Sequence, residues 1–254
     1  RRHARGGRLS RRVRTMPDAG SAAVARFSVD AVAFDLDGTL LDTIGDLAHA
    51  MNATLAEAGC APLPLATIRD LVGKGIPHLA RRAFELVRGN PPGDDELDAI
   101  VARYFAHYEA TLGERSAPYP GVVDGLARLR AAGLPLAIVT NKATRFVAPH
   151  LDRSPLGVSF DAIVGGDDAL AKKPSAAPLE LVAARLHVDV RRLLMVGDSA
   201  NDVACARAAG APVVAVSYGY REGRAVQDLS ADAIVDSLDE LPRLVAVRRP
   251  ASPR

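Results

Sequence analysis

The sequence predicts an α/β fold, in which a Rossmann-like core with a parallel sheet is interrupted by an inserted α-helical cap domain. Short apolar runs alternate with helical segments along most of the chain, which is the signature of α/β proteins. The runs are apolar throughout rather than alternating with polar residues, as expected for parallel strands that are covered by helices on both faces. The predicted strands are 31–34, 135–139, 162–164, 193–196, 213–216 and 233–235.

The interval between the first two of these strands predicts the insertion. The first strand ends near Asp35 and the next begins near Leu134, whereas a complete βαβ unit takes about 30 residues. Apolar residues recur at helical spacing within the interval, over 44–55, 79–87 and 94–112. We therefore predict that residues 44–116 form a helical cap domain, and that residues 27–43 and 117–246 form the core. Because active sites in such sheets lie at the carboxyl ends of the strands, we expect the cap to cover that edge.

Composition and charge indicate a globular protein with a basic arm. Hydrophobic residues make up 48% of the 254 residues and charged residues 24%, which is ordinary for a folded domain. Seven arginines and no acid occupy the first 14 residues, so the net charge of +2 becomes −5 for the remainder. We expect residues 1–26 to be a disordered basic extension and residues 247–254 a frayed tail. The arm has no aromatic residues, so nucleic-acid binding is not the expected function.

The sequence also gives expectations for location and assembly. The sequence has no apolar run of 18 or more residues and no apolar signal-peptide core after the basic start, so we expect no membrane partner. The two cysteines, Cys60 and Cys205, are expected to be free thiols in a reducing cytoplasm. Both a monomer and a homodimer remain open.

The stretch FDLDGTLLDT, residues 34–43, places two carboxylates at the end of the first strand. Asp35 and Asp37 can converge on one site because the chain turns at Gly38. An ionised carboxylate can attack an electrophile without a separate base. A second carboxylate can then give a proton to a departing oxygen and later take one from water, which suits the cleavage of a phosphate ester. The alternative is structural, namely that Asp37 or Thr39 caps the following helix.

Two further segments carry groups that suit a phosphate. Thr140 and Asn141 follow the strand 135–139 and bring a hydroxyl, a side-chain amide and the first backbone N–H groups of the next helix to the same edge. Lys173 stands directly before Pro174, and a lysine in such a fixed turn can balance the charge of an acid and a phosphate. An ordinary helix cap and a solvated lysine are the alternatives.

Two acids after the strand 193–196 predict a metal site. Asp198 and Asp202 lie four residues apart, where the strand leads into a helix. Hard oxygen donors close to a phosphate suit Mg²⁺, which keeps several water ligands and bridges to the substrate. The sequence therefore predicts Mg²⁺ as cofactor.

The motifs DxDGTLLDT, TN, KP and GDSxND occur in this order after successive strands, and together they resemble the haloacid dehalogenase superfamily of aspartate-nucleophile phosphatases. The likeness extends over roughly residues 29–240. It implies that Asp35 is the nucleophile and Asp37 the general acid/base. It also implies that Mg²⁺ is bound by Asp35, the backbone carbonyl of Asp37 and Asp198, with Asp202 supporting the metal.

The same resemblance assigns the remaining motif residues. Thr140 and Asn141 match the phosphate-binding motif, and Lys173 matches the charge-balancing lysine better than Lys172, which is one residue further from the proline. Dehalogenases of the superfamily lack the second acid, so Asp37 favours phosphate chemistry. A non-enzymatic binding protein is not expected, because such a protein need not keep all of these groups.

The cap loop LVGKGIP, residues 71–77, resembles that of phosphoglycolate phosphatases. The resemblance implies a small phosphorylated metabolite as substrate, with hydrolysis of 2-phosphoglycolate to glycolate and phosphate as the expected reaction. Lys74, supplemented by His78 or Arg81, would bind the substrate carboxylate. A phosphonate hydrolase would use a cap lysine as a Schiff base, and the glycine-flanked Lys74 does not suit that role. A sugar-phosphate phosphatase or phosphomutase shares the core motifs and remains the alternative.

Overall fold

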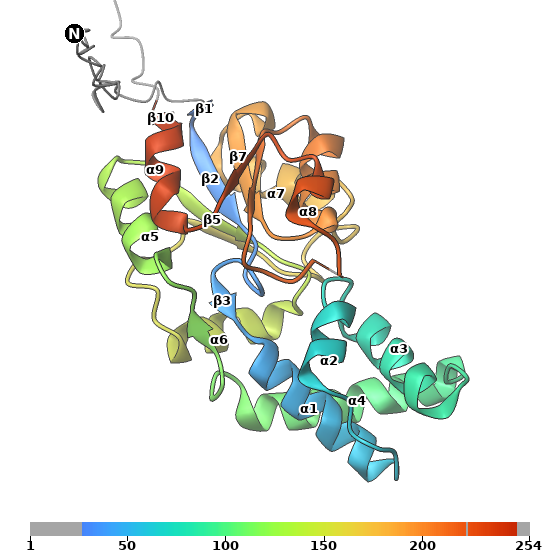
Figure 1. The fold of residues 1–254 in the computed structure, drawn as a ribbon. Coiled ribbons are helices and arrows are strands. Elements are labelled where there is room, and N and C mark those ends of the chain that lie inside the picture. The colour runs from blue at the N-terminus through green and yellow to red at the C-terminus, as the bar shows by residue number, and fades with distance from the viewer. Residues whose placement is uncertain (1–26, 222, 248–254) are drawn as a thin grey trace, which may run out of the picture.

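The computed structural model describes residues 27–221 and 223–247, and its centre is a six-stranded parallel sheet (Figure 1). The strand order is β6-β5-β2-β7-β8-β9, and neighbouring strands are parallel. All six predicted strands are confirmed within one or two residues. They are β2 (Ala31–Phe34), β5 (Leu136–Val139), β6 (Ala162–Val164), β7 (Leu193–Gly197), β8 (Val213–Val216) and β9 (Ala233–Val235).

The two faces of the sheet are covered by different helices. In β2, Val32 and Phe34 point to one face, where they pack against α5 (Val122–Ala131), while Ala31 and Ala33 point to the other, against α7 (Ala177–Leu186) and α8 (Ala200–Ala209). Every residue of β2 is buried, which explains why the strand sequence is apolar without alternation. Burying one large apolar side chain such as Phe34 stabilises the fold by about 1.5–3 kcal/mol.

The strand order places the site. The chain runs from β2 to its neighbour β5 and outward to β6, and then returns to β7 on the other side of β2. The order therefore reverses at β2, and the loops that follow β2, β5 and β7 diverge from one edge of the sheet. Ligands of open α/β sheets bind at this kind of switch point. Residues that follow these three strands are thus brought together at the carboxyl edge.

Four helices of the insert form a separate layer over this edge, as Figure 1 shows. They are α1 (Ile44–Glu57), α2 (Leu65–Leu71), α3 (Ile76–Arg88) and α4 (Asp94–Thr111). The three predicted cap helices are present, whereas α2 was not predicted. The cap has its own apolar core, which includes Met51, Phe84 and Tyr104. The chain enters it through β3 (Leu41–Asp42) and leaves it through β4 (Ala117–Pro118), and these two strands pair with each other in antiparallel fashion.

A second small sheet lies at the far end of the core. Its strands, β1 (Phe27–Val29) and β10 (Val245–Val247), are parallel and were not predicted. The remaining elements are short: η1 (Thr144–Phe146), α6 (Val147–Arg153), η2 (Val190–Arg192), η3 (Val226–Leu229), η4 (Leu238–Glu240) and α9 (Leu241–Leu244). The predicted extension 1–26 and most of the predicted tail, residues 248–254, lie outside the described residues.

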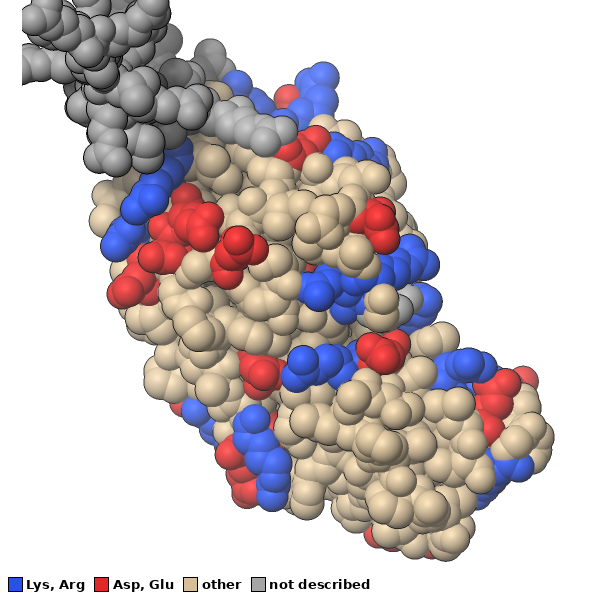
Figure 2. Space-filling model, in the orientation of Figure 1, with Lys and Arg blue, Asp and Glu red and all other residues tan. Residues whose placement is uncertain are grey.

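The charges on the surface and the lengths of the helices concern two possible partners, nucleic acid and membrane. Figure 2 shows acidic and basic side chains interspersed over the visible face, without a single basic patch there. In the described part of the chain, no helix is both long and apolar enough to cross a membrane. Cys60 follows α1 and Cys205 lies in α8, and both are free thiols, as predicted.

Candidate active site

Three acidic side chains meet at the carboxyl edge of the sheet. Asp35 follows β2, Asp198 follows β7, and Asp202 lies in the first turn of α8. One carboxylate oxygen from each lies within 4.8 Å of the others. The predicted strand-end acids are therefore brought together in space, in a cluster that can hold a divalent cation.

Asp35 is held by two contacts to one of its oxygens. Its Oδ1 accepts a hydrogen bond from the Leu36 backbone N–H at 2.7 Å and lies 3.0 Å from the Lys173 ammonium. Burial raises the pKa of Asp35 to about 7, and repulsion from Asp202 adds to this shift, while Lys173 opposes it.

Lys173 is the charge partner of this cluster. Its side chain is only 1% exposed, and its ammonium lies 3.0 Å from Asp35 and 2.6 Å from Asp202. It also donates to the carbonyl of Val139, at the end of β5. Burial alone would lower the pKa of Lys173, but attraction to Asp202 and Asp35 outweighs it and the pKa is raised. Lys173 is therefore a buried cation, as its predicted role requires, and not the solvated lysine of the alternative.

Asp202 has a structural role besides its place in the cluster. Its Oδ2 accepts hydrogen bonds from the backbone N–H groups of Asp198 and Ser199 and from the Ser199 hydroxyl. The bond from the Ser199 N–H is one half of a capping box at the start of α8, and in the other half the Asp202 N–H donates to the Ser199 side chain. Its Oδ1 contacts Lys173. Both oxygens thus have protein partners, and the predicted support of a metal by Asp202 stays a prediction.

Asp198 is buried close to two other acids, Asp202 and Asp35. Its carboxylate accepts hydrogen bonds from the Thr39 hydroxyl and the Tyr220 backbone N–H. Burial and the nearby Asp202 and Asp35 nevertheless raise its pKa well above the usual range. A divalent cation would relieve this repulsion, so the donor set fits the predicted metal.

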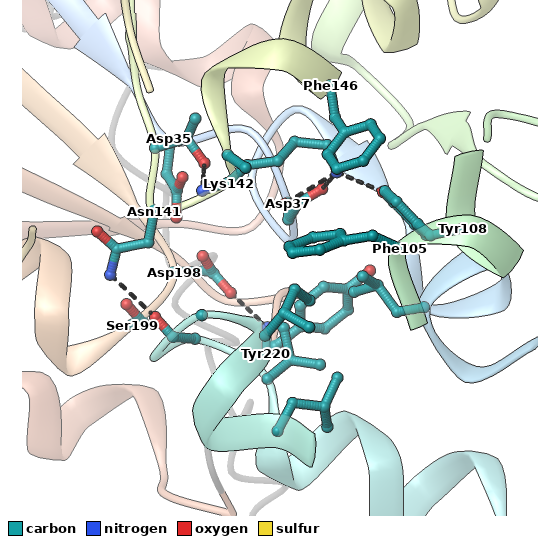
Figure 3. Close-up of a pocket in the computed structure, with 18 residues that line it drawn as sticks. Asp35, Asp37, Phe105, Tyr108, Asn141, Lys142, Phe146, Asp198, Ser199 and Tyr220 are labelled. Atoms are coloured by element: carbon teal, nitrogen blue, oxygen red, sulfur yellow. Dashed lines mark hydrogen bonds and ion pairs between the residues drawn. The ribbon is translucent and has the colours of Figure 1, made fainter. Parts of the chain in front are cut away.

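Asp37 lies beside Lys142, a residue for which the sequence motifs predicted no role. The Lys142 ammonium is 3.1 Å and 3.3 Å from the two carboxylate oxygens of Asp37, and it also donates to the Tyr108 hydroxyl of α4 (Figure 3). Burial raises the pKa of Asp37, but the charges of Lys142 and of His150 outweigh it, so the pKa is lowered. In the sequence, the one sign that Lys142 belongs to the site is its position directly after Thr140 and Asn141, at the end of β5.

Thr140 and Asn141 line a cavity between core and cap. Asn141 also forms hydrogen bonds to the loops that contain Gly73 and Lys173. Its Oδ1 accepts from the Lys173 N–H at 3.0 Å, and its Nδ2 donates to the carbonyls of Lys173 and Gly73 at 3.0 Å and 3.1 Å. Asn201 donates to the same Gly73 carbonyl at 3.2 Å. Two core side chains thereby bind the cap loop, and the predicted phosphate contacts of Thr140 and Asn141 stay predictions.

The acids open into a cavity of about 60 Å³ between core and cap. Its floor includes Asp35, Asp37 and Asp198, and its walls are mostly apolar and aromatic, as Figure 3 shows. Lys74 is exposed and is not among the residues that line this cavity, and its predicted contact with the substrate carboxylate stays a prediction. Arg81 pairs with Asp94 at 2.7 Å, within the cap.

Comparison with known proteins identifies the family. Residues 32–216 match the family of haloacid dehalogenase-like hydrolases. The chain is 46% identical over 217 residues to a phosphoglycolate phosphatase of Nitrosospira multiformis, covering 85% of this chain and 96% of that protein. Its fold is similar to the crystal structure of a predicted phosphoglycolate phosphatase from Haemophilus somnus, with a TM-score of 0.79, 30% identity, and 85% and 97% of the two chains covered.

A third relative carries a sugar ligand. The crystal structure of a CbbY mutant from Rhodobacter sphaeroides in complex with xylulose-(1,5)bisphosphate has a TM-score of 0.72 and 26% identity, with 86% of this chain and all of that chain covered. The fold, the motif order and these matches agree. The chain belongs to the haloacid dehalogenase-like hydrolases.

Proposed function

We propose that this enzyme is a Mg²⁺-dependent phosphatase that hydrolyses 2-phosphoglycolate to glycolate and phosphate through an aspartyl-phosphate on Asp35. The observation that carries the proposal is the placement of Asp35 beside Lys173 and of Asp37 beside Lys142, on the floor of one small cavity. Asp35 can supply the nucleophilic oxygen, and Asp37 can supply the carboxyl group that releases and takes up a proton. The 46% identical phosphoglycolate phosphatase supports the choice of substrate.

In the first step, Asp35 attacks the phosphorus of the ester. A bond forms between its carboxylate oxygen and phosphorus while the ester oxygen departs. Asp37, which has to be protonated when this step begins, gives that oxygen its proton, so that an alcohol leaves. Lys173 lies 3.0 Å from Asp35 and balances the negative charge of the carboxylate. The Thr140 hydroxyl, in the pocket wall, would bind a phosphoryl oxygen.

In the second step, Asp37 takes a proton from water, and the oxygen of that water attacks phosphorus. The bond between phosphorus and Asp35 breaks, which releases phosphate and restores the Asp35 carboxylate and the proton on Asp37. Mg²⁺, held by Asp35, Asp198 and the Asp37 carbonyl with support from Asp202, would neutralise charge on the phosphoryl oxygens. The cap, which Asn141 and Asn201 bind through Gly73, would exclude other water.

A sugar-phosphate phosphatase or phosphomutase is the second candidate. The similarity to a CbbY structure that holds xylulose-(1,5)bisphosphate favours it. The cavity walls speak against it, because Leu47, Ile76, Leu79, Phe105 and Phe146 offer no partner for the hydroxyl groups of a sugar.

A panel of phosphate esters tests the proposal. We expect purified enzyme with Mg²⁺ to release phosphate from 2-phosphoglycolate with the highest kcat/KM, above that from glucose 1-phosphate or xylulose bisphosphate. Chelation should stop turnover, and added Mg²⁺ should restore it. Asp35→Asn should abolish turnover of every ester because the amide is not nucleophilic. Faster hydrolysis of the sugar phosphates would favour the second candidate, and a wild-type rate in Asp35→Asn would exclude the mechanism.

A further inference from the structure

The cavity contains a single cationic side chain among the described residues that line it. That residue is Lys142, and the other ionisable groups of the floor are the acids Asp35, Asp37 and Asp198. Two exposed lysines lie nearby but outside the lining. Lys74 is on the cap loop, and the Lys172 ammonium is 3.6 Å from the point at which a side chain on Gly75 would begin. A carboxylate that enters the cavity therefore finds one ammonium there.

The position of Lys142 matches that of the carboxylate in the proposed substrate. In 2-phosphoglycolate a single CH₂ group separates the ester oxygen from the carboxylate. Asp37, as the proton donor, must lie against the ester oxygen. The Lys142 ammonium is 3.1 Å from Asp37, so it lies next to the place where the carboxylate has to go.

The surroundings of Lys142 make its charge effective. The side chain is 4% exposed, and its ammonium lies 4.8 Å from the centre of the Tyr108 ring and donates to the Tyr108 hydroxyl. Phe146 and Phe105 line the cavity beside them. An ion pair is much stronger in such a water-poor, apolar environment than at the surface, where Lys74 and Lys172 lie.

We propose, on the basis of the phosphatase function above, that Lys142 binds the substrate carboxylate and that Tyr108 holds its ammonium in place. An ammonium has three N–H donors. Tyr108 takes one and the oxygens of Asp37 take the others, so a bound carboxylate would share the ammonium with Asp37. Because Tyr108 belongs to the cap and Lys142 to the core, the carboxylate would be bound where the two domains meet.

Calorimetric binding to Asp35→Asn protein with Mg²⁺ tests this assignment without turnover. The ligands are 2-phosphoglycolate and ethyl phosphate, which has a methyl group in place of the carboxylate. Adding Lys142→Met should weaken 2-phosphoglycolate binding about 10- to 100-fold, the effect of losing a charge-assisted hydrogen bond. Ethyl phosphate binding should change by less than about threefold. Tyr108→Phe should show the same selectivity with a smaller loss, and it serves as the test if Lys142→Met does not fold.

The controls are the exposed lysines, and the possible outcomes are distinct. Lys74→Met and Lys172→Met should leave the preference for 2-phosphoglycolate in place, and a selective loss in either would overturn the assignment to Lys142. An equal loss on both ligands in Lys142→Met would show that Lys142 serves Asp37 instead. A preference that survives Lys142→Met overturns the role of Lys142 alone. Equal binding of both ligands before that change would overturn the proposed substrate as well.

Discussion

The phenol oxygen of Tyr220 lies 2.7 Å from the backbone nitrogen of Thr43 and 2.9 Å from that of Ile44, at the start of α1. Thr43, the residue before the helix, makes no capping hydrogen bond with its own side chain. The same hydroxyl donates to Asp42 at 2.7 Å. A core residue therefore caps the first helix of the cap domain, and it does so beside the strand β3 through which the chain enters that domain.

Tyr220→Phe should destabilise the protein by about 1–3 kcal/mol, because it removes the acceptor of the Thr43 N–H and the closer of two acceptors of the Ile44 N–H, the other being Oδ1 of Asp42 at 3.4 Å. Urea unfolding followed by circular dichroism measures the change. Tyr218→Phe is the matched control, since the Tyr218 hydroxyl donates one hydrogen bond, to the Thr39 carbonyl. That variant should lose about 1 kcal/mol at most. Equal stability losses in the two variants would argue against a capping role for Tyr220.

Lys173→Met should abolish activity and destabilise the fold by about 3–5 kcal/mol at pH 8, because Asp35 and Asp202 would be left buried without a cation. The loss should shrink as the pH is lowered. The pKa of Asp35 is already raised, so the folded state takes up protons as the pH falls, and protonation removes the repulsion. Lys172→Met, at the exposed neighbouring position, should change stability by less than about 0.5 kcal/mol. Urea unfolding at pH 8 and pH 5.5 compares the two.

Gly38→Ala should damage the proposed metal site as well as the fold. Gly38 has φ of 89°, and a Cβ there would lie 2.4 Å from Oδ2 of Asp198. The added methyl group must displace that carboxylate, so we expect kcat/KM to fall and more Mg²⁺ to be needed for half-maximal activity. Gly59→Ala is the control for backbone strain without a steric clash, because Gly59 has φ of 68° and nothing within 4 Å of its Cβ position. It should cost about 1 kcal/mol of stability with normal Mg²⁺ dependence.

His150 should make the protein less stable in mild acid. The side chain is fully buried, and burial together with the charge of Lys142 lowers the pKa of His150 to about 4, although Asp37 and Asp46 oppose the shift. Unfolded His150 has a pKa of about 6.5. The unfolded state therefore binds the extra proton first as the pH falls, and stability is lost below pH 6.5.

The expected size of this effect is about 2 kcal/mol between pH 7.5 and pH 5. His150→Gln cannot titrate, so its unfolding free energy should fall by correspondingly less over the same range. Urea unfolding at both pH values gives the difference between the two proteins. Parallel pH profiles would show that His150 is already charged in the folded state or titrates alike in both states.

The sheet and the acids could be predicted from sequence because their signals are local. The runs that became β2 and β7 are apolar throughout, and Asp35 and Asp198 directly follow them. The missed elements have weak local signals. Helix α2 has seven residues, of which only Ile68 is buried, and β1 and β10 have three residues each, so only their pairing reveals them.

The features of the site that could not be predicted are contacts between residues far apart in the sequence. Lys142 meets Tyr108, 34 positions away, and Tyr220 meets Thr43, 177 positions away. Helical spacing predicted a helix over 94–112, and Tyr108 lies in that helix and in the cap core. Which core residue the Tyr108 hydroxyl would reach depends on how the cap is placed over the sheet, and no periodicity contains that information.

The pairing of β3 with β4 has an evolutionary consequence. Leu41 lies opposite Pro118 and Asp42 opposite Ala117, so the two ends of the insert are only about 5 Å apart, as in a hairpin. A segment joined in this way is an exchangeable cassette, since a helical module of another size can replace it without shifting a strand of the main sheet. Asp35, Lys173 and Asp198 all lie outside the cassette. Selection can therefore exchange the cap while these three residues keep their places in the core.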